Sequence, residues 1–310
     1  MGFSEEQVIE VLAQVFASSD PRLLIGIGDD AALVQGNHHQ ILTTDIAVEG
    51  VHFRRDWSSP YEIGRRIAAA NIADVISMNG RCDYFLVAAT LTGSESLDWI
   101  RDLAQGIADQ AKDAGAIVVG GDLARSSTLS IAITAVGHGE KIVKRSGAQV
   151  GDSIYLSSLT GWSAAGLDIL VRNLNLSGLA AAKALNEYRA PSLDLLSDFS
   201  AATSMADVSD AVMIQGAQMA KASQVRFKID GAAITKSDEY SELLALANEA
   251  GADIWSWILQ GGEDHALLAT GKGLPGLLIG EVVEGAGIVA ELNGKEIKMA
   301  PESWSHFQRD

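Results

Sequence analysis

Residues 84–122 have the sequence YFLVAATLTGSESLDWIRDLAQGIADQAKDAGAIVVGGD, which contains three segments of different periodicity. Residues 84–91 form a short apolar run that predicts a buried strand. Residues 97–115 carry apolar side chains at helical spacing and predict an amphipathic helix that ends at Gly115. Residues 116–122 predict a second strand. A strand, a helix and a strand in this order favour an α+β or α/β fold.

The segments on either side of this stretch continue the alternation. We expect a first helix over residues 4–16, where Ser4 and Gln7 form a capping box. Residues 31–34 and 40–48 flank the polar sequence GNHH and predict a hairpin. A long helix begins at Pro60 and ends at Asn79-Gly80. Residues 129–139 predict a further strand, so this half has a compact α+β pattern.

The polar, glycine-containing segment KRSGAQVGDSIY, residues 144–155, indicates a join between two domains, residues 1–146 and 147–310. In the second domain we expect helices over residues 163–172, 193–202, 209–223 and 237–251. We expect strands over residues 153–158, 224–229, 265–270, 277–283 and 288–292. There is no short repeat typical of a solenoid.

The composition excludes several classes of protein. The chain has 310 residues, 47% of them hydrophobic, and a net charge of −17, which argues against non-specific binding to nucleic acid or to anionic membrane surfaces. Cys82 is the single cysteine, so no intramolecular disulfide can form. The acidic, amphipathic N-terminus differs from a cationic secretory signal. No apolar run reaches the roughly 18 residues of a membrane span. We therefore expect a globular, cytoplasmic protein.

Several aspartates stand beside apolar or glycine-rich sequence, where a lone carboxylate is costly. They are Asp30, which ends GIGDD at residues 26–30, and Asp45, Asp74, Asp122, Asp207 and Asp210. Mg²⁺ takes oxygen ligands and uses substrate phosphates as further ligands. A cation held between protein and phosphate explains why glycines and adjacent carboxylates occur together in GIGDD.

Each aspartate also has a structural interpretation. Asp30 and Asp122 suit turns or caps, and Asp207 or Ser209 suits a helix N-cap. Asp74 is the exception, because its helical spacing places it on one face with Ile67 and Asn71. A carboxylate on that face needs a partner.

Common nucleotide and catalytic motifs are absent from the sequence. It lacks GxxxxGK[ST], a strand–GxGxxG–helix unit and the HRD and DFG motifs of protein kinases. It also lacks CxxC, HExxH and GxSxG. An enzyme that acts on phosphates must therefore use a less common scaffold.

An ordered set of segments covers residues 26–268 and resembles the thiamine-monophosphate kinase family. The segments are GIGDDAALV, TTDIAVEGVHF, NIADVISMNG, GGDLARSS, KRSGAQVGDSIYLSSLTGWSAAGL, APSLD, ADVSDAV and QGGEDHALL, with a weaker match in SWSHF near the end of the chain. Each segment alone is weakly specific, and the ordered set is highly specific. The wider superfamily includes enzymes similar to aminoimidazole ribonucleotide synthetase.

The resemblance implies a Mg²⁺-dependent kinase that transfers the γ-phosphoryl group of ATP to thiamine monophosphate. It implies an N-terminal α+β domain with a mixed sheet, which binds ATP and Mg²⁺ and dimerises. It also implies a C-terminal α/β domain with a mixed sheet flanked by helices, which completes the nucleotide and substrate site. The expected partners are ATP, thiamine monophosphate and a second copy of the chain.

The resemblance also implies the roles of individual residues. The metal ligands would be Asp30, Thr44, Asp45, Asp74, Asp122, Asp207 and Asp210, with Thr43 a neighbouring candidate. The nucleotide would contact Gly121, Asp122, Arg145 and Ser209, and the substrate would contact His52, Glu263 and Trp304. Asp210 and Arg145 would act in catalysis. Without the resemblance, Arg145 suits a surface linker, Glu263 a loop, His52 a packed or surface position, and Trp304 the packing of the C-terminus.

The chain departs from the family pattern at Ala73 (usually serine), Asn79 (usually glycine), Ala211 (glycine), His265 (tyrosine) and Ala266 (glutamate). These departures concern the substrate more than phosphoryl transfer, since all six aspartates are present. Two other functions stay open. One is a related ATP-dependent enzyme with another small acceptor, and the other is a non-catalytic nucleotide-binding or maturation scaffold.

Overall fold

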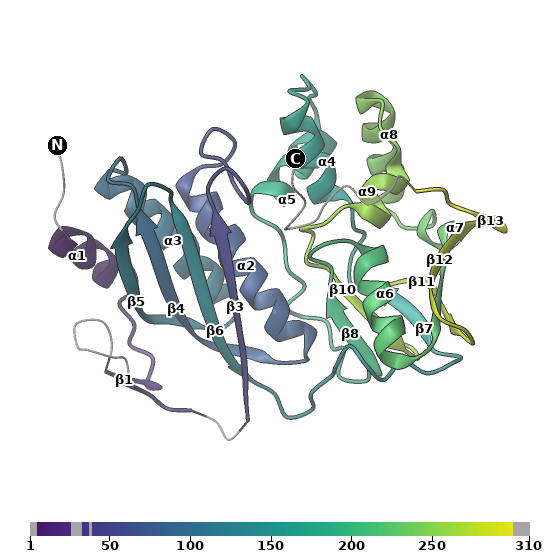
Figure 1. Cartoon of the computed structure of the whole chain (residues 1–310), viewed down its shortest axis with the longest axis horizontal. Coiled ribbons are helices and arrows are strands. Elements are labelled where there is room, and N and C mark those ends of the chain that lie inside the picture. Colours follow the sequence, from purple (N-terminus) through teal and green to yellow (C-terminus); the bar gives the residue numbers. More distant parts are fainter. Residues whose placement is uncertain (1–4, 26–32, 37–38, 300–310) are drawn as a thin grey trace. The chain divides into compact units, whose positions relative to one another are not determined.

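The computed structural model describes residues 5–25, 33–36 and 39–299 (Figure 1). The chain divides into two compact units, and each is described by itself. The first unit contains Met1–Ile142 and Arg189–Leu195, and the second contains Val143–Tyr188 and Leu196–Asp310. Each unit combines helices with a mixed sheet, which confirms the predicted fold class. The division of nucleotide and substrate roles between residues 1–146 and 147–310 stays a prediction.

The first unit is built on a four-stranded sheet. Its elements are α1 (Glu5–Val15), β1 (Leu23–Ile25), β2 (Leu33–Val34), β3 (Gln40–Val48), α2 (Pro60–Ser77), β4 (Arg81–Leu91), α3 (Leu97–Asp113), β5 (Ile117–Arg125) and β6 (Ser130–His138). The strand order is β3-β6-β4-β5. The β4–β5 pair is parallel, whereas β6 is antiparallel to both β3 and β4. The strand–helix–strand pattern predicted over residues 84–122 is confirmed as β4, α3 and β5.

Helices α2 and α3 pack together on one face of this sheet (Figure 1). Helix α2 begins with a capping box between Ser59 and Glu62, and Pro60 stands in its first turn. Ile63, Ile72 and Phe85 are fully buried between helices and strands. The opposite face of the sheet carries the exposed apolar side chains of Leu42, Ile46 and Leu86.

The second unit is built on a seven-stranded sheet. Its elements are β7 (Ser153–Leu156), α4 (Trp162–Val171), α5 (Leu179–Arg189), β8 (Ser204–Asp207), α6 (Val212–Ser223), β9 (Arg226–Asp230), α7 (Gly231–Ile234), α8 (Tyr240–Ala250), α9 (Ile254–Gln260), β10 (Leu267–Gly271), β11 (Leu277–Val283), β12 (Gly287–Leu292) and β13 (Lys295–Glu296). The strand order is β13-β12-β9-β11-β7-β10-β8, and only the β12–β9 pair is parallel. Helix α6 lies against β12, β8 and β9, and all five residues of β10 are buried.

Two expectations from the sequence are wrong. Strand β3 does not form a hairpin with β2; it pairs with β6 over its whole length, and β2 pairs with β1. Nine residue pairs with β6 outweigh a short local hairpin. The helix expected over residues 193–202 is absent, because Leu193 and Leu195 pack against the first unit's core from a non-helical segment. Helices α5, α7 and α9 and strands β1, β8 and β13 were not predicted.

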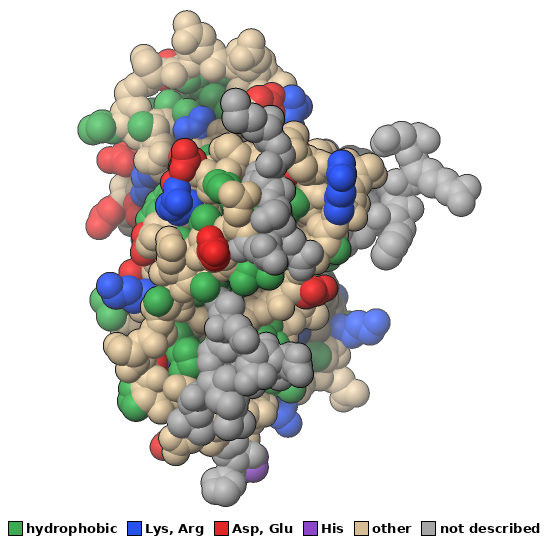
Figure 2. All heavy atoms as spheres, turned by 90° about the vertical axis from the view of Figure 1, so that its left-hand side faces the viewer, with side chains coloured by type: hydrophobic (Ala, Val, Ile, Leu, Met, Phe, Trp, Pro, Cys, Tyr) green, Lys and Arg blue, Asp and Glu red, His purple; other side chains and the backbone are tan. Residues whose placement is uncertain are grey.

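The remaining bulk properties agree with the sequence analysis. Among the described residues, no helix combines the length and apolar character that a bilayer crossing requires. Cys82 is buried, and burial raises the pKa of its thiol to about 12, as in an unreactive structural cysteine. On the face drawn in Figure 2, acidic and basic side chains are interspersed. The net charge of −17 therefore does not gather there into one acidic patch.

A buried carboxylate ties the loop after β4 to the segment after β3. The side chain of Glu95 is fully buried and pairs with Arg55. It also accepts hydrogen bonds from the backbone N–H groups of Thr92 and Gly93, at 3.1 and 2.9 Å. Burial alone would raise the pKa of Glu95, but hydrogen bonds from its own backbone, the Thr92 hydroxyl, Arg55 and the Gly93 N–H lower it from 4.5 to about 2. Glu95 thus stabilises the contact between the loop after β4 and the segment after β3 only when its carboxylate is charged.

This lowered pKa makes the stability of the first unit depend on pH. A depressed pKa contributes stability that is present above pH 4.5 and is lost as the pH falls toward 2. The full contribution is on the order of 3 kcal/mol. We expect Glu95→Gln to lower the free energy of unfolding at pH 7 and to flatten its decline below pH 4.5, measured by urea denaturation. Asp98→Asn is the control, since the Asp98 side chain is 88% exposed. Parallel pH profiles for the parent and Glu95→Gln would contradict the assignment.

Candidate functional site

In the second unit, the predicted site residues cluster where β8 passes into α6. Asp207 is the last residue of β8 and is buried, and Ser209 and Asp210 follow in the connecting loop. Ala211 is the N-cap of α6 and has an extended backbone, with φ −173° and ψ 154°. Alanine adopts this conformation without strain, so the departure from glycine at residue 211 costs no backbone freedom.

The loop that contains Glu263 is joined by backbone hydrogen bonds to the loop that contains Asp210. The Glu263 N–H donates to the Ser209 carbonyl at 2.7 Å, and the His265 N–H donates to the Val208 carbonyl at 3.0 Å. Gly262 lies directly against the carbonyl oxygens of Ser209 and Asp210, so that any Cβ at this position would collide with them. The QGGEDH and DVSDA segments therefore form one site although some fifty residues separate them.

His265 lies beneath this site and links two acidic side chains. It is only 4% exposed. Its Nδ1 is 3.4 Å from Asp207 Oδ2, and its Nε2 is 3.8 Å from Glu263 Oε2. Burial lowers the pKa of His265, but Asp207 and Glu263 outweigh burial and raise the pKa to about 10. The imidazole thus stands between the two carboxylates, with Nδ1 facing Asp207 and Nε2 facing Glu263.

Asp264 has a structural role that the sequence analysis missed. Its carboxylate accepts hydrogen bonds from the backbone N–H groups of Gly161 and Ser163, at 2.9 and 3.0 Å, and so caps the start of α4. Burial raises the pKa of Asp264 to about 7, although both hydrogen bonds act in the opposite direction. The acid that follows Glu263 thus anchors the loop that Glu263 stands on.

Gln215 of α6 is a second residue that the sequence analysis missed. Its Oε1 accepts from the Ala211 N–H at 2.9 Å, and its Nε2 donates to Asp210 Oδ2 at 3.1 Å and to Ser209 Oγ at 3.3 Å. The spacing of four residues between Ala211 and Gln215 is the available sequence signal. Arg145 lies in the same unit, is exposed, and donates to Gln218 of α6 at 2.8 Å.

In the first unit, the structure brings together three of the predicted metal ligands. Thr43 and Asp45 are two residues apart on β3 and therefore lie on the same face of the strand. The Thr43 hydroxyl donates to Asp74 Oδ2 of α2. Asn71, which is fully buried, accepts from the Asp45 N–H at 3.2 Å and donates to the Ile67 carbonyl at 3.0 Å. The helical spacing of Asp74 indicated that it needs a partner, and Thr43 supplies one.

Thr44 does not join that group. Its side chain is on the opposite face of β3, where its hydroxyl donates to the Ile133 carbonyl at 3.0 Å. In this structure the Thr44 hydroxyl therefore does not share a metal site with Thr43 and Asp74. The predicted role of Thr44 stays a prediction.

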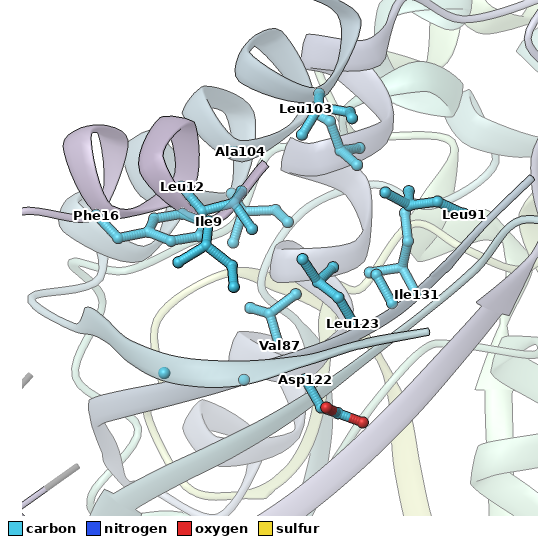
Figure 3. Close-up of a pocket in the computed structure, with 15 residues that line it drawn as sticks. Ile9, Leu12, Phe16, Val87, Leu91, Leu103, Ala104, Asp122, Leu123 and Ile131 are labelled. Carbon is cyan, nitrogen blue, oxygen red and sulfur yellow. The ribbon is translucent and has the colours of Figure 1, made fainter. Parts of the chain in front are cut away.

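Asp122 is on β5 at the edge of an apolar cavity of the first unit (Figure 3). This cavity of about 290 Å³ is lined by α1, α3 and the strands β4 and β5, including Leu12, Leu103 and Leu123. The Asp122 side chain points away from it, toward the other face of β5 (Figure 3). Apolar walls do not suit phosphate groups, so the exposed Asp122 carboxylate, not the cavity, is the candidate nucleotide contact.

The other predicted site residues are placed as follows. His52 is half-buried in the turn after β3, where its Nδ1 accepts from the Val48 N–H at 3.1 Å. Gly121 on β5 lies so close to the Val87 carbonyl that a side chain at this position would collide with it. Asp30 and Trp304 lie outside the described residues, so their roles stay predictions.

The described acids fit a magnesium ion that also binds phosphate. Within residues 5–25, 33–36 and 39–299, no group of three or more His, Cys, Asp or Glu side chains could hold a metal alone. Mg²⁺, however, usually binds through one or two carboxylates, several waters and substrate phosphates. The Thr43–Asp74 pair and the loop with Asp207 and Asp210 offer such oxygen donors in small sets. Their full use as ligands therefore requires a phosphate substrate.

The capping role of Asp264 gives a test of how the site is held. We expect Asp264→Asn to lower the free energy of unfolding by roughly 1–3 kcal/mol, because an amide can accept only one of the two N–H groups and leaves the other unsatisfied. Thermal and urea denaturation measure this. Asp253→Asn is the matched control: Asp253 caps α9 through one hydrogen bond, to the Trp255 N–H at 3.1 Å, and asparagine serves equally well there. Equal losses in both variants would refute the two-acceptor role.

Comparison with known proteins places these residues in a family context. Residues 28–138 match the family described as AIR synthase related protein, N-terminal domain. The thiamine-monophosphate kinase of Corynebacterium glutamicum is 34% identical over 280 residues, which cover 86% of this chain and 81% of that protein.

Solved structures agree with the sequence relationship. The crystal structure of thiamine-monophosphate kinase from Stenotrophomonas maltophilia K279a matches with a TM-score of 0.80 at 26% identity, covering 96% of this chain and 99% of that chain. The structure of AaThiL complexed with AMPPCP and TMP matches with a TM-score of 0.78 at 28% identity, covering 98% of this chain and 97% of that chain. The chain therefore belongs to the thiamine-monophosphate kinase family.

Proposed function

We propose that this chain transfers the γ-phosphoryl group of ATP to the phosphate of thiamine monophosphate, giving thiamine diphosphate and ADP. Family membership is the observation that carries this proposal. It is supported by the position of Ser209, Asp210 and Glu263 on two loops joined by backbone hydrogen bonds. A phosphate oxygen of the acceptor attacks the γ-phosphorus while the bond from that phosphorus to the β-phosphate oxygen breaks.

The residue types suit this reaction. The acceptor oxygen is already anionic near neutral pH, so the step requires no strong general base, and catalysis depends on in-line positioning and on neutralising charge. Mg²⁺, when bound, supplies most of the positive charge that the phosphates need. In the first unit Thr43, Asp45 and Asp74 are the candidate ligands, together with Asp122. In the second unit Asp207 and Asp210 are the candidates.

Two further side chains have proposed contacts with the substrates. Arg145 is exposed, and its guanidinium can bind phosphate oxygens in the fork geometry that lysine lacks. Glu263 can face the cationic end of thiamine, and His265 beneath it supports its orientation. The departure from tyrosine at residue 265 therefore acts on the substrate through Glu263.

The first test is a product assay. Purified protein is incubated with ATP, MgCl₂ and thiamine monophosphate, and the thiamine phosphates are separated by chromatography. We expect thiamine diphosphate and ADP in equal amounts, and none after EDTA treatment. ADP without thiamine diphosphate would mean that water takes the phosphoryl group and that thiamine monophosphate is not the acceptor.

The same assay tests the metal ligands. We expect Asp210→Asn and Asp74→Asn each to lower kcat by at least about 100-fold, the size seen when one electrostatic contact to the transition state is lost. Asp230→Asn is the control, because Asp230 is an exposed N-cap of α7 in the second unit and is not one of the candidate site residues. Full activity of Asp210→Asn would exclude Asp210 as a ligand.

We also propose that the chain forms a homodimer through the open face of the four-stranded sheet. Helices α2 and α3 cover the other face (Figure 1). On the open face Leu42, Ile46 and Leu86 are 66%, 58% and 42% exposed. Three large apolar side chains on β3 and β4, the two strands that flank β6, are unusual for a free surface. A second copy of the same face is the self-complementary partner expected of a two-fold dimer.

The dimer proposal predicts a change in mass. We expect the double variant Leu42→Glu, Ile46→Glu to elute as a monomer in size-exclusion chromatography with light scattering, whereas the parent elutes as a dimer. Burying two carboxylates in an apolar interface is costly. Leu179→Glu is the control, since Leu179 is an isolated leucine on α5 that is 91% exposed. A monomeric parent protein would refute the proposal.

The cytoplasm is the proposed location. Cys82 is the only cysteine of the chain and is buried and free, and proteins of reducing compartments generally lack disulfides.

A further inference from the structure

We propose that Gln215 is a positioning residue for phosphoryl transfer, which it serves by holding the Asp210 carboxylate and the Ser209 hydroxyl in place for a magnesium-bound nucleotide. The inference rests on the proposed function, since Asp210 and Ser209 are its candidate metal and nucleotide contacts. Nothing in the ordered set of family segments, which ends at Val212 and resumes at Gln260, points to this residue.

Both polar side-chain atoms of Gln215 form hydrogen bonds with residues of the site. It is 1% exposed, so its amide has no access to bulk water. The amide oxygen accepts from the Ala211 N–H at 2.9 Å. The amide nitrogen donates to Asp210 Oδ2 at 3.1 Å and to Ser209 Oγ at 3.3 Å. A buried amide whose donors and acceptor are all used has a single favoured orientation.

The oxygen and the nitrogen of the Gln215 amide bind different parts of the site. The oxygen satisfies a backbone N–H at the start of α6, where the N-cap residue Ala211 has no capping side chain. The nitrogen restrains one oxygen of Asp210 and leaves Asp210 Oδ1 for another ligand. Helix capping and the positioning of Asp210 thus belong to different atoms of one side chain, and substitutions can separate them.

The restraint matters because Asp210 is an acid on a loop. A carboxylate that must rotate into place for each metal ion loses part of its binding free energy to ordering. The amide donor also lowers the repulsion between Asp210 and the incoming phosphates without adding a full charge. Glutamate at residue 215 would keep the acceptor for the Ala211 N–H but would place a second carboxylate against Asp210. Methionine would remove both contacts at similar volume.

The experiment compares Gln215→Glu and Gln215→Met with the parent protein. Two quantities are measured: kcat with saturating ATP and thiamine monophosphate, and the affinity for AMPPCP with and without MgCl₂ by calorimetry. Melting temperatures are recorded for all variants. Gln149→Glu is the matched control, because it makes the same chemical change at an exposed position of the same unit.

We expect both substitutions to lower kcat by about tenfold to 100-fold, the range that corresponds to a lost hydrogen bond to a charged group. Affinity for AMPPCP should fall by about tenfold with MgCl₂ and by much less without it. Gln215→Glu should melt at a lower temperature than the parent, because it keeps the cap of α6 but brings two carboxylates together in a buried position. The KM for thiamine monophosphate should change little.

Two results would overturn the inference. If Gln215→Glu matches the parent in kcat and in magnesium-dependent affinity while Gln215→Met melts at lower temperature, Gln215 only caps α6. If both variants keep the parent's affinity for AMPPCP with MgCl₂, Asp210 does not need the donor. The calorimetry keeps this test separate from the proposed function. A parent protein that binds AMPPCP with MgCl₂ but does not phosphorylate thiamine monophosphate refutes the acceptor and still allows Gln215 to be tested.

Discussion

The close approach of Gly262 to the backbone of Ser209 and Asp210 is the constraint on which the second unit's site depends. Only a residue without Cβ fits against these two carbonyl oxygens. The approach lets Glu263 and His265 bond to Ser209 and Val208. It also requires Glu263 and His265 to adopt positive φ values of 65° and 52°. Each such residue costs roughly 1–3 kcal/mol. The backbone hydrogen bonds and the Asp264 cap on α4 hold the loop in this conformation, so the strain is retained where the substrate is proposed to bind.

The first unit holds its acids by a different device. Asp45 and Thr43 stand on β3, and Asp74 stands on α2, where it accepts from the Thr43 hydroxyl. Asn71 joins the helix to the strand by accepting from the Asp45 N–H, while its Nδ2 donates to the Ile67 carbonyl within α2. Here the regular geometry of a helix packed on a strand does the positioning, and no strained backbone is needed. The acids occur in small sets in both units, which suits a cation that is shared with substrate phosphates. An acidic chain can bind an anionic nucleotide in this way, because the metal inverts the sign of the local field.

The sequence predicted well what depends on local periodicity. The elements β4, α3 and β5 were predicted correctly from residues 84–122, because the apolar residues of each segment recur with the period of the strand or helix that it forms. The spacing of Asp74 relative to Ile67 and Asn71 placed it toward the strand for the same reason. The predictions that failed concern contacts between residues that are far apart in the sequence. The pairing of β3 with β6 joins residues about ninety positions apart, and the segment with Leu193 and Leu195 follows the core of the first unit, not its own helix propensity. Asp264 binds Gly161 from 103 residues away, so no local pattern marks it as a cap.

The departures from the family pattern differ in their physical weight. Ala211 has an extended backbone, so the loss of glycine costs nothing there. Asn79 has a φ of 59°, a left-handed conformation that asparagine tolerates better than most residues, and its side chain donates to the Lys141 carbonyl at 2.8 Å. Ala73 is fully buried, where a serine hydroxyl would need a partner that alanine does not. His265 is different in kind, because it inserts an imidazole ring between Asp207 and Glu263. It changes the side chain beneath the proposed thiamine contact while the acids proposed as metal ligands are kept, so the chemistry particular to this chain is concentrated at the Glu263–His265 end of the site.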